Sequence, residues 1–153
     1  MRRLLLALCA MAMLTHGARL IAQGSTYEEN ALRIEDSRGD MRIVRGAQGT
    51  VVGRIGVFRG TDIVKLVQSS ERAAVEARMF VHDYKPGTLS LAVGVAILGA
   101  GIGISRIHDV DTGITTGLLI SGTTLIVYGA GRLENAYNAL ARSLWWYNRD
   151  LRN

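Results

Sequence analysis

A chain of 153 residues has room for one domain of ordinary size, or for a small domain together with a membrane anchor. Its formal net charge of +5 includes Arg2, Arg3 and Arg19, and without these three the excess falls to +2. That excess is too small to indicate nucleic-acid binding. The charges are also segregated, because residues 89–105 and 112–131 contain none.

The N-terminal segment has the composition of a secretory signal peptide. Two arginines precede an apolar run at 4–14, and small residues two positions apart precede Ser25. This pattern predicts a signal peptide over 1–24 that is removed before Ser25. An uncleaved anchor that extends through 18–22 is the alternative. The single cysteine, Cys9, follows a leucine and so lacks the small residue that a lipoprotein signal needs before its cysteine.

Residues 25–87 predict a small exported α+β region. We expect it to lean on the membrane surface or on a partner, because so few residues make a marginal core. Proline lacks an N–H and disfavours helix in the residue before it, so Pro86-Gly87 is expected to end the last helix. The expected elements are a polar helix or ordered arm at 27–36, β-prone runs at 41–44, 50–52 and 55–58, a turn at 46–49, a short helix capped by Thr61 or Asp62, and a helix at 69–84.

Residues 88–131 predict a transmembrane hairpin. Each of the runs 88–105 and 114–131 approaches the roughly 20 residues that cross a bilayer. The loop at 106–112 is short, so the two helices are antiparallel neighbours. A pair of buried helices in a soluble core is the alternative, but the chain has little other apolar surface to cover them. The fold class is therefore an α-helical membrane hairpin of two transmembrane helices with a small α+β extramembrane region.

Small residues recur four positions apart in both runs, which predicts close helix packing. The same faces could instead join copies of the chain. The residues are Ala92, Ala96, Gly99, Ala100 and Gly103 in the first run, and Gly113, Gly117 and Ser121 in the second.

Residues 132–153 predict an amphipathic continuation of the second helix. Its apolar stripe comprises Leu133, Tyr137, Leu140 and Leu144, and an aromatic cluster of Trp145, Trp146 and Tyr147 follows. Aromatic rings of this kind favour the headgroup layer, so the cluster is expected to be a membrane-interface anchor. An anchor for a partner subunit is the alternative.

The orientation of the hairpin contains a conflict. A cleaved signal exports residues 25–87 and leaves the 106–112 loop inside. The positive-inside rule prefers the reverse, since Lys85, Arg132 and Arg142 flank the opposite ends. We follow the signal, because it acts first during export.

The sequence indicates no catalytic, cofactor or metal site. His108 with Asp109 and Asp111 is a weak metal candidate, and His82 with Asp83 is a weak enzymatic one. The glycines at 99–103 lack the Lys-Ser/Thr of a phosphate loop and lie within an apolar run. Neither apolar run contains a charged residue, which argues against ion transport.

The layout resembles uncharacterised exported bacterial proteins with a two-helix Gly-rich hairpin, of the kind common in Bacteroidetes-like genomes. The matching residues are those at 70–73, 94–103 and 147–148. The resemblance implies the architecture and a bacterial envelope, with residues 25–87 on the periplasmic side, but no activity. We therefore expect a non-enzymatic structural or accessory membrane protein whose partners are the bilayer and another membrane protein or itself. The alternative is a small homo-oligomeric channel.

Overall fold

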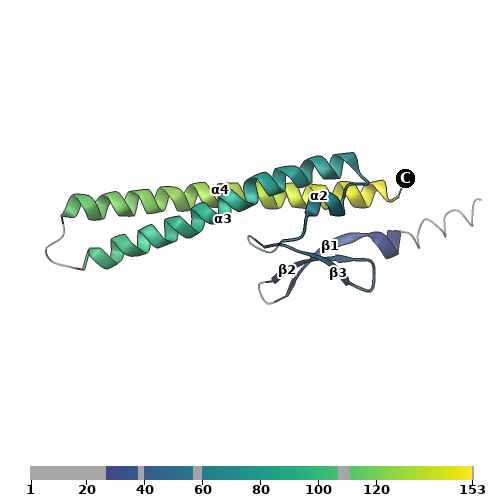
Figure 1. The fold of residues 1–153 in the computed structure, drawn as a ribbon, viewed down its shortest axis with the longest axis horizontal. Helices are drawn as coiled ribbons and strands as arrows, with labels where there is room; N and C mark the ends of the chain where they lie inside the picture. The colour runs from purple at the N-terminus through teal and green to yellow at the C-terminus, as the bar shows by residue number, and fades with distance from the viewer. Residues whose placement is uncertain (1–26, 38–39, 57–59, 107–110, 153) are drawn as a thin grey trace, which may run out of the picture.

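The structure, a computed structural model, describes residues 27–37, 40–56, 60–106 and 111–152 (Figure 1). The predicted signal peptide lies outside these residues. The fold is mostly helical, with two long apolar helices and a small three-stranded sheet, as the sequence indicated. The elements are β1 (Leu32–Ser37), β2 (Asp40–Arg45), β3 (Thr50–Arg54), α2 (Ile63–Leu66), α3 (Glu71–Ile104) and α4 (Thr112–Asp150).

The sheet is antiparallel with the order β1-β2-β3. The predicted turn at 46–49 joins β2 to β3, and the positive φ of Gly46 (70°) and Gly49 (67°) suits glycine. A bulge between Ile43 and Val44 lets both of these consecutive residues be fully buried, although residues in a regular strand alternate between the two faces.

Residues 27–36, expected to be a polar helix or an ordered arm, are helical only at 27–30, because β1 gains a complete ladder of pairs with β2. The prediction of a third β-prone run at 55–58 was wrong for its first two residues: β3 continues through Gly53 to Arg54, and residues 55–56 lie beyond it in no strand. Residues 57 and 58 lie outside the described residues.

The prediction that Pro86-Gly87 ends a helix was also wrong, since α3 runs unbroken from Glu71 to Ile104. The proline removes the backbone hydrogen bond that residue 86 would donate to His82 O, and the Thr88 hydroxyl adds a bond to Tyr84 O over 2.9 Å. Packing of α3 against α4 on both sides of Pro86 outweighs the local preference to stop. The predicted α+β region and the hairpin therefore share one continuous helix pair.

Along this pair, α3 and α4 approach each other at every seventh residue. The buried residues that follow this seven-residue spacing are Ala73, Phe80, Gly87, Gly94 and Gly101 on α3, and Gly122, Gly129, Ala136 and Ser143 on α4. A Cβ added to Gly94 would lie 2.8 Å from Gly122 O, and one on Gly129 would lie 2.8 Å from Gly87 O. At the far end Ser143 Oγ donates to Ala73 O over 2.9 Å. A seven-residue repeat of this kind is the contact pattern of supercoiled helices.

Of the eight small residues predicted to pack the hairpin, Gly99, Gly103 and Gly117 do not face the other helix. Residues four apart lie on successive turns of a helix and drift around its axis, so a four-residue series leaves the contact line. A seven-residue series stays on it. A Cβ added to Gly99, Gly103 or Gly117 would meet nothing within 4 Å, and Gly113 would meet only its own capping residue, Asp111. The remaining four, Ala92, Ala96, Ala100 and Ser121, are also exposed.

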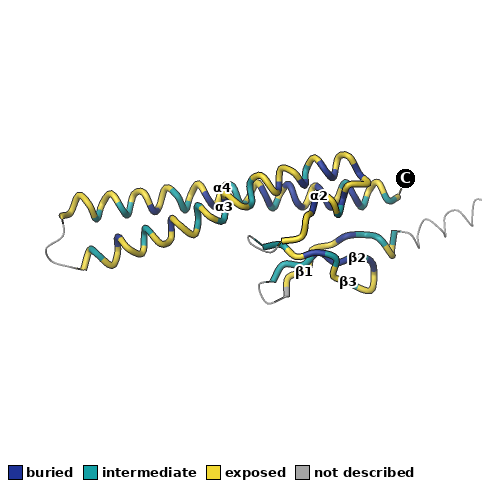
Figure 2. Tube along the Cα trace, viewed as in Figure 1, coloured by how far each residue is buried: buried dark blue, intermediate teal, exposed yellow. Residues whose placement is uncertain are grey.

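The hydrophobic core lies in the half of the helix pair that carries its charged residues, 71–87 of α3 and 132–150 of α4, called here the charged half. There Leu32 and Ile43 of the sheet and Ile63 and Val67 of the α2 region pack against α3 and α4, around the fully buried Leu140. Figure 2 shows the buried segments gathered beside the sheet and α2, while the far end of the helix pair is mostly exposed. The α+β region therefore leans on its own helices.

Two polar contacts tie the ends of this region together. The Asn148 side chain on α4 donates to Leu32 O and accepts from Leu32 N, both over 2.7 Å, and so pairs with the start of β1 as a strand would. Ser70 caps α3 by accepting from Ala73 N, and its hydroxyl donates to Asp150 over 2.5 Å. The sheet, the start of α3 and the end of α4 are thus fixed to one another.

Candidate functional site

The helix pair is divided into two halves with different surroundings. Both helices are long and apolar enough to cross a membrane, yet only 17% and 11% of the residues in their most apolar 18-residue windows are buried. Side chains such as Val95, Ile114 and Val127 are 55%, 58% and 66% exposed. A helix of a soluble core would bury these side chains, so this half carries a long apolar surface that none of the described residues covers.

The aromatic cluster lies at the far end of α4 from the apolar run. Trp145 stands 14 residues beyond Gly131 on one continuous helix, about 21 Å at 1.5 Å per residue. Tyr147 is only 7% exposed and belongs to the core beside the sheet. The interface role of Trp145, Trp146 and Tyr147 stays a prediction.

At that far end the aromatic rings stack with arginines. Trp145 and Trp146 meet edge to face with their centroids 4.7 Å apart, and the Arg149 guanidinium lies 4.9 Å from the Trp146 ring. Arg72 of α3 lies 4.7 Å from the same ring, and Arg152 lies 4.3 Å from the ring of Tyr27. With Trp145 at 56% exposure, this end presents a cationic and aromatic surface, and residues of these types are enriched in protein interfaces.

A second polar feature lies at the border between the two halves. The close approach of Gly87 and Gly129 sets the register of the helices there. One turn toward the charged half, Arg132 of α4 reaches across to Asp83 of α3, with Nη1 2.5 Å from Oδ1. The same carboxylate oxygen is 2.9 Å from His82 Nδ1, and Arg132 Nε donates to the Tyr128 hydroxyl over 3.0 Å.

These contacts line an open groove, called here the polar groove, with a volume of about 720 Å³. Its walls come from both helices and comprise Arg78, Met79, His82, Asp83, Arg132, Asn135, Asn138, Ala139 and Arg142. Its charged members are three arginines against one carboxylate. Glu76, just outside the lining, pairs with Arg142 over 2.9 Å. The polar groove is therefore a basic surface at the edge of the apolar half.

Hydrogen bonding keeps the Asp83–Arg132 pair ionised. Partial burial of Asp83 opposes its ionisation, but hydrogen bonds from His82 and Arg132 outweigh the burial and lower the pKa of Asp83 below its usual 3.8. Hydrogen bonds to Asp83 and Tyr128 raise the pKa of Arg132 in turn. The pair therefore stays charged at any physiological pH.

The lowered pKa of Asp83 gives a pH-dependent prediction. A carboxyl whose pKa is lower in the folded state stabilises that state above its unfolded pKa of about 3.8, and the contribution is lost as the pH falls through the folded value. We expect Asp83→Asn to reduce the free energy of unfolding at neutral pH, and we expect its difference from the wild type to shrink at acid pH. Denaturation of both proteins in mild detergent across this range measures it. A difference independent of pH would contradict an ionic role.

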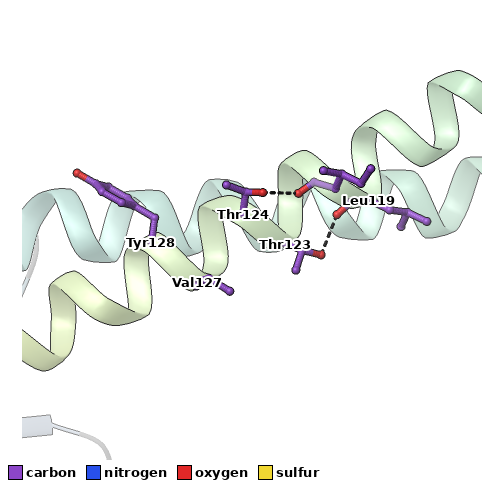
Figure 3. Close-up of a pocket in the computed structure, with 6 residues that line it drawn as sticks. Leu119, Thr123, Thr124, Val127 and Tyr128 are labelled. Carbon is purple, nitrogen blue, oxygen red and sulfur yellow. Dashed lines mark hydrogen bonds between the residues drawn. The ribbon is translucent and has the colours of Figure 1, made fainter.

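An apolar groove adjoins the polar one on α4 (Figure 3). It is lined by Leu119, Ile120, Thr123, Thr124, Val127 and Tyr128. Its two threonine hydroxyls donate to the carbonyls of Leu119 and Ile120, over 2.8 and 2.9 Å, and so present their methyl groups outward. The groove offers apolar contact without an unsatisfied polar group, as a lipid-facing surface requires.

The structure gives little support to the predicted metal and enzymatic candidates. His108 and Asp109 lie outside the described residues, and Asp111 caps α4 by accepting from Gly113 N over 2.6 Å. Among the residues that the structure places, no three His, Cys, Asp or Glu side chains gather where a metal could bind. His82 and Asp83 do lie together, but Arg132 already occupies the carboxylate. The pairing of Asp83 with Arg132 was not predicted; its signal was that Asp83 precedes the first apolar run and Arg132 follows the second, which an antiparallel hairpin brings to the same end.

Comparison with known proteins identifies no relative. No family model, curated protein or solved structure matches the chain. The resemblance to exported bacterial hairpin proteins therefore stays a prediction, and the function must be argued from the geometry.

Proposed function

We propose that this chain is a non-enzymatic structural or accessory membrane protein of a bacterial cell envelope. Its apolar helical half crosses the bilayer, and its charged half holds the sheet and the aromatic end on the exported, periplasmic side for a partner complex. One observation carries the proposal: a single continuous helix pair is bare and apolar at one end, and at the other it is covered by a sheet around a hydrophobic core.

The continuity of the helices gives the proposal a mechanical meaning. No loop separates the anchor from the exported region, since α3 and α4 each run through the border without a break. The α+β region is therefore held at a fixed height and orientation above the bilayer. The exposed end at Trp145 and Arg149 would lie about 20 Å or more from the hydrocarbon, where a partner in the periplasm could reach it.

Cysteine labelling in intact spheroplasts tests the anchor and its orientation together. In a Cys9→Ser background, single cysteines replace Gln48 in the turn of the sheet, Arg106 at the tip of the hairpin, and Val127 in the apolar half. We expect a membrane-impermeant maleimide to label position 48 at once and position 106 only after permeabilisation. Position 127, which is 66% exposed in the structure, should resist labelling because lipid surrounds it.

The labelling outcomes separate the possible failures. Labelling of position 127 as fast as position 48 would place the apolar half in water and refute the anchor. Exchange of the patterns at 48 and 106 would keep the anchor and reverse its orientation. Mass spectrometry of the protein from native membranes then tests the accessory role, which predicts a start at Ser25 and a stoichiometric companion chain.

A second candidate is a small homo-oligomeric channel or permeability factor. It is favoured by the outward position of Gly99, Gly103 and Gly117, which leaves a smooth helical face open to another copy. Replacing Gly99 and Gly103 by leucine should leave the hairpin intact, because an added Cβ at either position meets nothing within 4 Å. Loss of a stable oligomer with the folded monomer retained would support the channel. An oligomer that survives the replacement would exclude that face as its interface.

A further inference from the structure

We propose that the polar groove and the apolar groove together bind one anionic phospholipid, with its phosphate at Arg132 and an acyl chain along α4. This inference rests on the proposed membrane anchor and adds a specific ligand to it. A bilayer anchor by itself requires no preference among lipids, so the two ideas make different predictions.

The two grooves meet at one pair of residues. Tyr128 lines the apolar groove and Arg132 lines the polar groove, and the Tyr128 hydroxyl accepts from Arg132 Nε over 3.0 Å. A ligand that fills both grooves must therefore be apolar on one side of this pair and polar on the other. Tyrosine favours the same border in a bilayer, since its ring is apolar and its hydroxyl is wet.

The charge of the polar groove selects an anion. Three arginines face one carboxylate in its lining. Asp83 and Glu76 pair with Arg132 and Arg142, which leaves the charge of Arg78 uncompensated, and the Arg132 side chain is still 30% exposed. Arg78 is exposed and makes no ion pair with any residue that the structure describes. Guanidinium groups suit phosphate because their planar array of donors matches its oxygens. The groove thus retains free donors and positive charge for a phosphate.

Position makes a lipid the source of that phosphate. Arg132 is the first charged residue after the uncharged run 112–131, so it lies where the phosphates of a bilayer would lie. The polar groove then continues toward Arg142, ten residues or about 15 Å further along α4. Asn135 and Asn138 line this extension and can bond hydroxyl groups. A headgroup with hydroxyls beyond its phosphate, such as glycerol, fits this arrangement.

Lipid retention by the purified full chain tests the proposal. The protein is reconstituted in phosphatidylcholine vesicles that contain a minor fraction of phosphatidylglycerol, extracted in mild detergent, and examined by native mass spectrometry. We expect the wild type to retain phosphatidylglycerol in preference to phosphatidylcholine. Arg132→Gln and Arg78→Gln should each reduce that retention by about tenfold, the effect of losing one charge-assisted hydrogen bond.

Two controls make the result decisive. Arg149→Gln removes an arginine at the aromatic end, far from the groove, and should retain phosphatidylglycerol as the wild type does. Arg78→Gln separates loss of binding from loss of folding, because Arg78 makes no ion pair across the described helix pair. Arg132→Gln, by contrast, also breaks the pair with Asp83. Proper folding of each variant is checked by its circular dichroism.

Each outcome decides one question. Equal retention by the wild type and Arg78→Gln, or equal loss in Arg149→Gln, would overturn the groove as the site. Displacement of the lipid by soluble glycerol phosphate at comparable concentration would show a plain phosphate site and overturn the lipid assignment. A protein that does not insert into the vesicles at all would refute the membrane anchor itself, which cysteine labelling detects independently.

Discussion

Replacing Gly129 by leucine is expected to force α3 and α4 apart and to reduce the free energy of unfolding by about 3 kcal/mol or more. A Cβ at this position would lie 2.6 Å from Leu91 N and 2.8 Å from Gly87 O. Both neighbours are backbone atoms of a helix, so neither can turn aside as a flexible side chain would. The effect should therefore reach or exceed the upper end of overpacking costs.

Gly131→Leu is the matched control, because it places the same side chain two residues away on the same helix. A Cβ on Gly131 meets nothing within 4 Å. The replacement should leave stability unchanged or raise it by up to about 1 kcal/mol, since glycine is a poor helix former. Both free energies can be measured by unfolding the protein from mild detergent into dodecyl sulfate. Equal effects at the two positions would show that the close contact at Gly129 is not what holds the hairpin.

Leu140→Ala is expected to loosen the sheet from the helices, at a cost of about 2–5 kcal/mol. Leu140 is fully buried in the core where β1, β2 and the α2 region meet α3 and α4. Truncation removes apolar contacts and leaves a cavity that the rigid helix pair cannot close. Limited proteolysis should therefore cut within residues 40–54 faster than in the wild type, while insertion into the bilayer is retained.

Val75→Ala provides the comparison for this second prediction. Val75 lies on α3 in the same half of the pair but is 43% exposed, so its truncation should change stability by no more than about 0.5 kcal/mol. If Leu140→Ala also abolished membrane insertion, the two halves would form a single cooperative unit. Their separation by surroundings, on which the proposed function depends, would then be wrong.

The sequence by itself determined the composition of the two halves. Uncharged runs of about 18 residues predict long apolar helices in any context, since their length and hydrophobicity are local properties. The turn at 46–49 and a cap at Thr61 or Asp62, of which the structure uses Asp62, were also predictable, because turn glycines and N-cap oxygens act on their own neighbouring backbone.

Some features could not be read from local rules because tertiary contacts overrode them. Pro86 and Gly87 carry the usual signals for a helix end, yet Gly87 is buried at the contact with Gly129, and packing along the pair keeps α3 continuous. Likewise the polar segment 27–36 was expected to be a helix or an ordered arm. From Leu32 onward it forms β1 instead, because β1 pairs with β2 and with the Asn148 side chain 116 residues away.

The face on which each helix packs depends both on the spacing of its small residues and on the position of the other helix. Small residues occur at intervals of four and of seven in these helices, and only the seven-residue series stays on one line between two supercoiled helices. That series, running through Gly87, Gly94 and Gly101 to its counterparts Gly122 and Gly129, was present in the sequence. The register that brings Asp83 to Arg132 follows from it, and only the tertiary structure decides it, because a register is a property of two helices together.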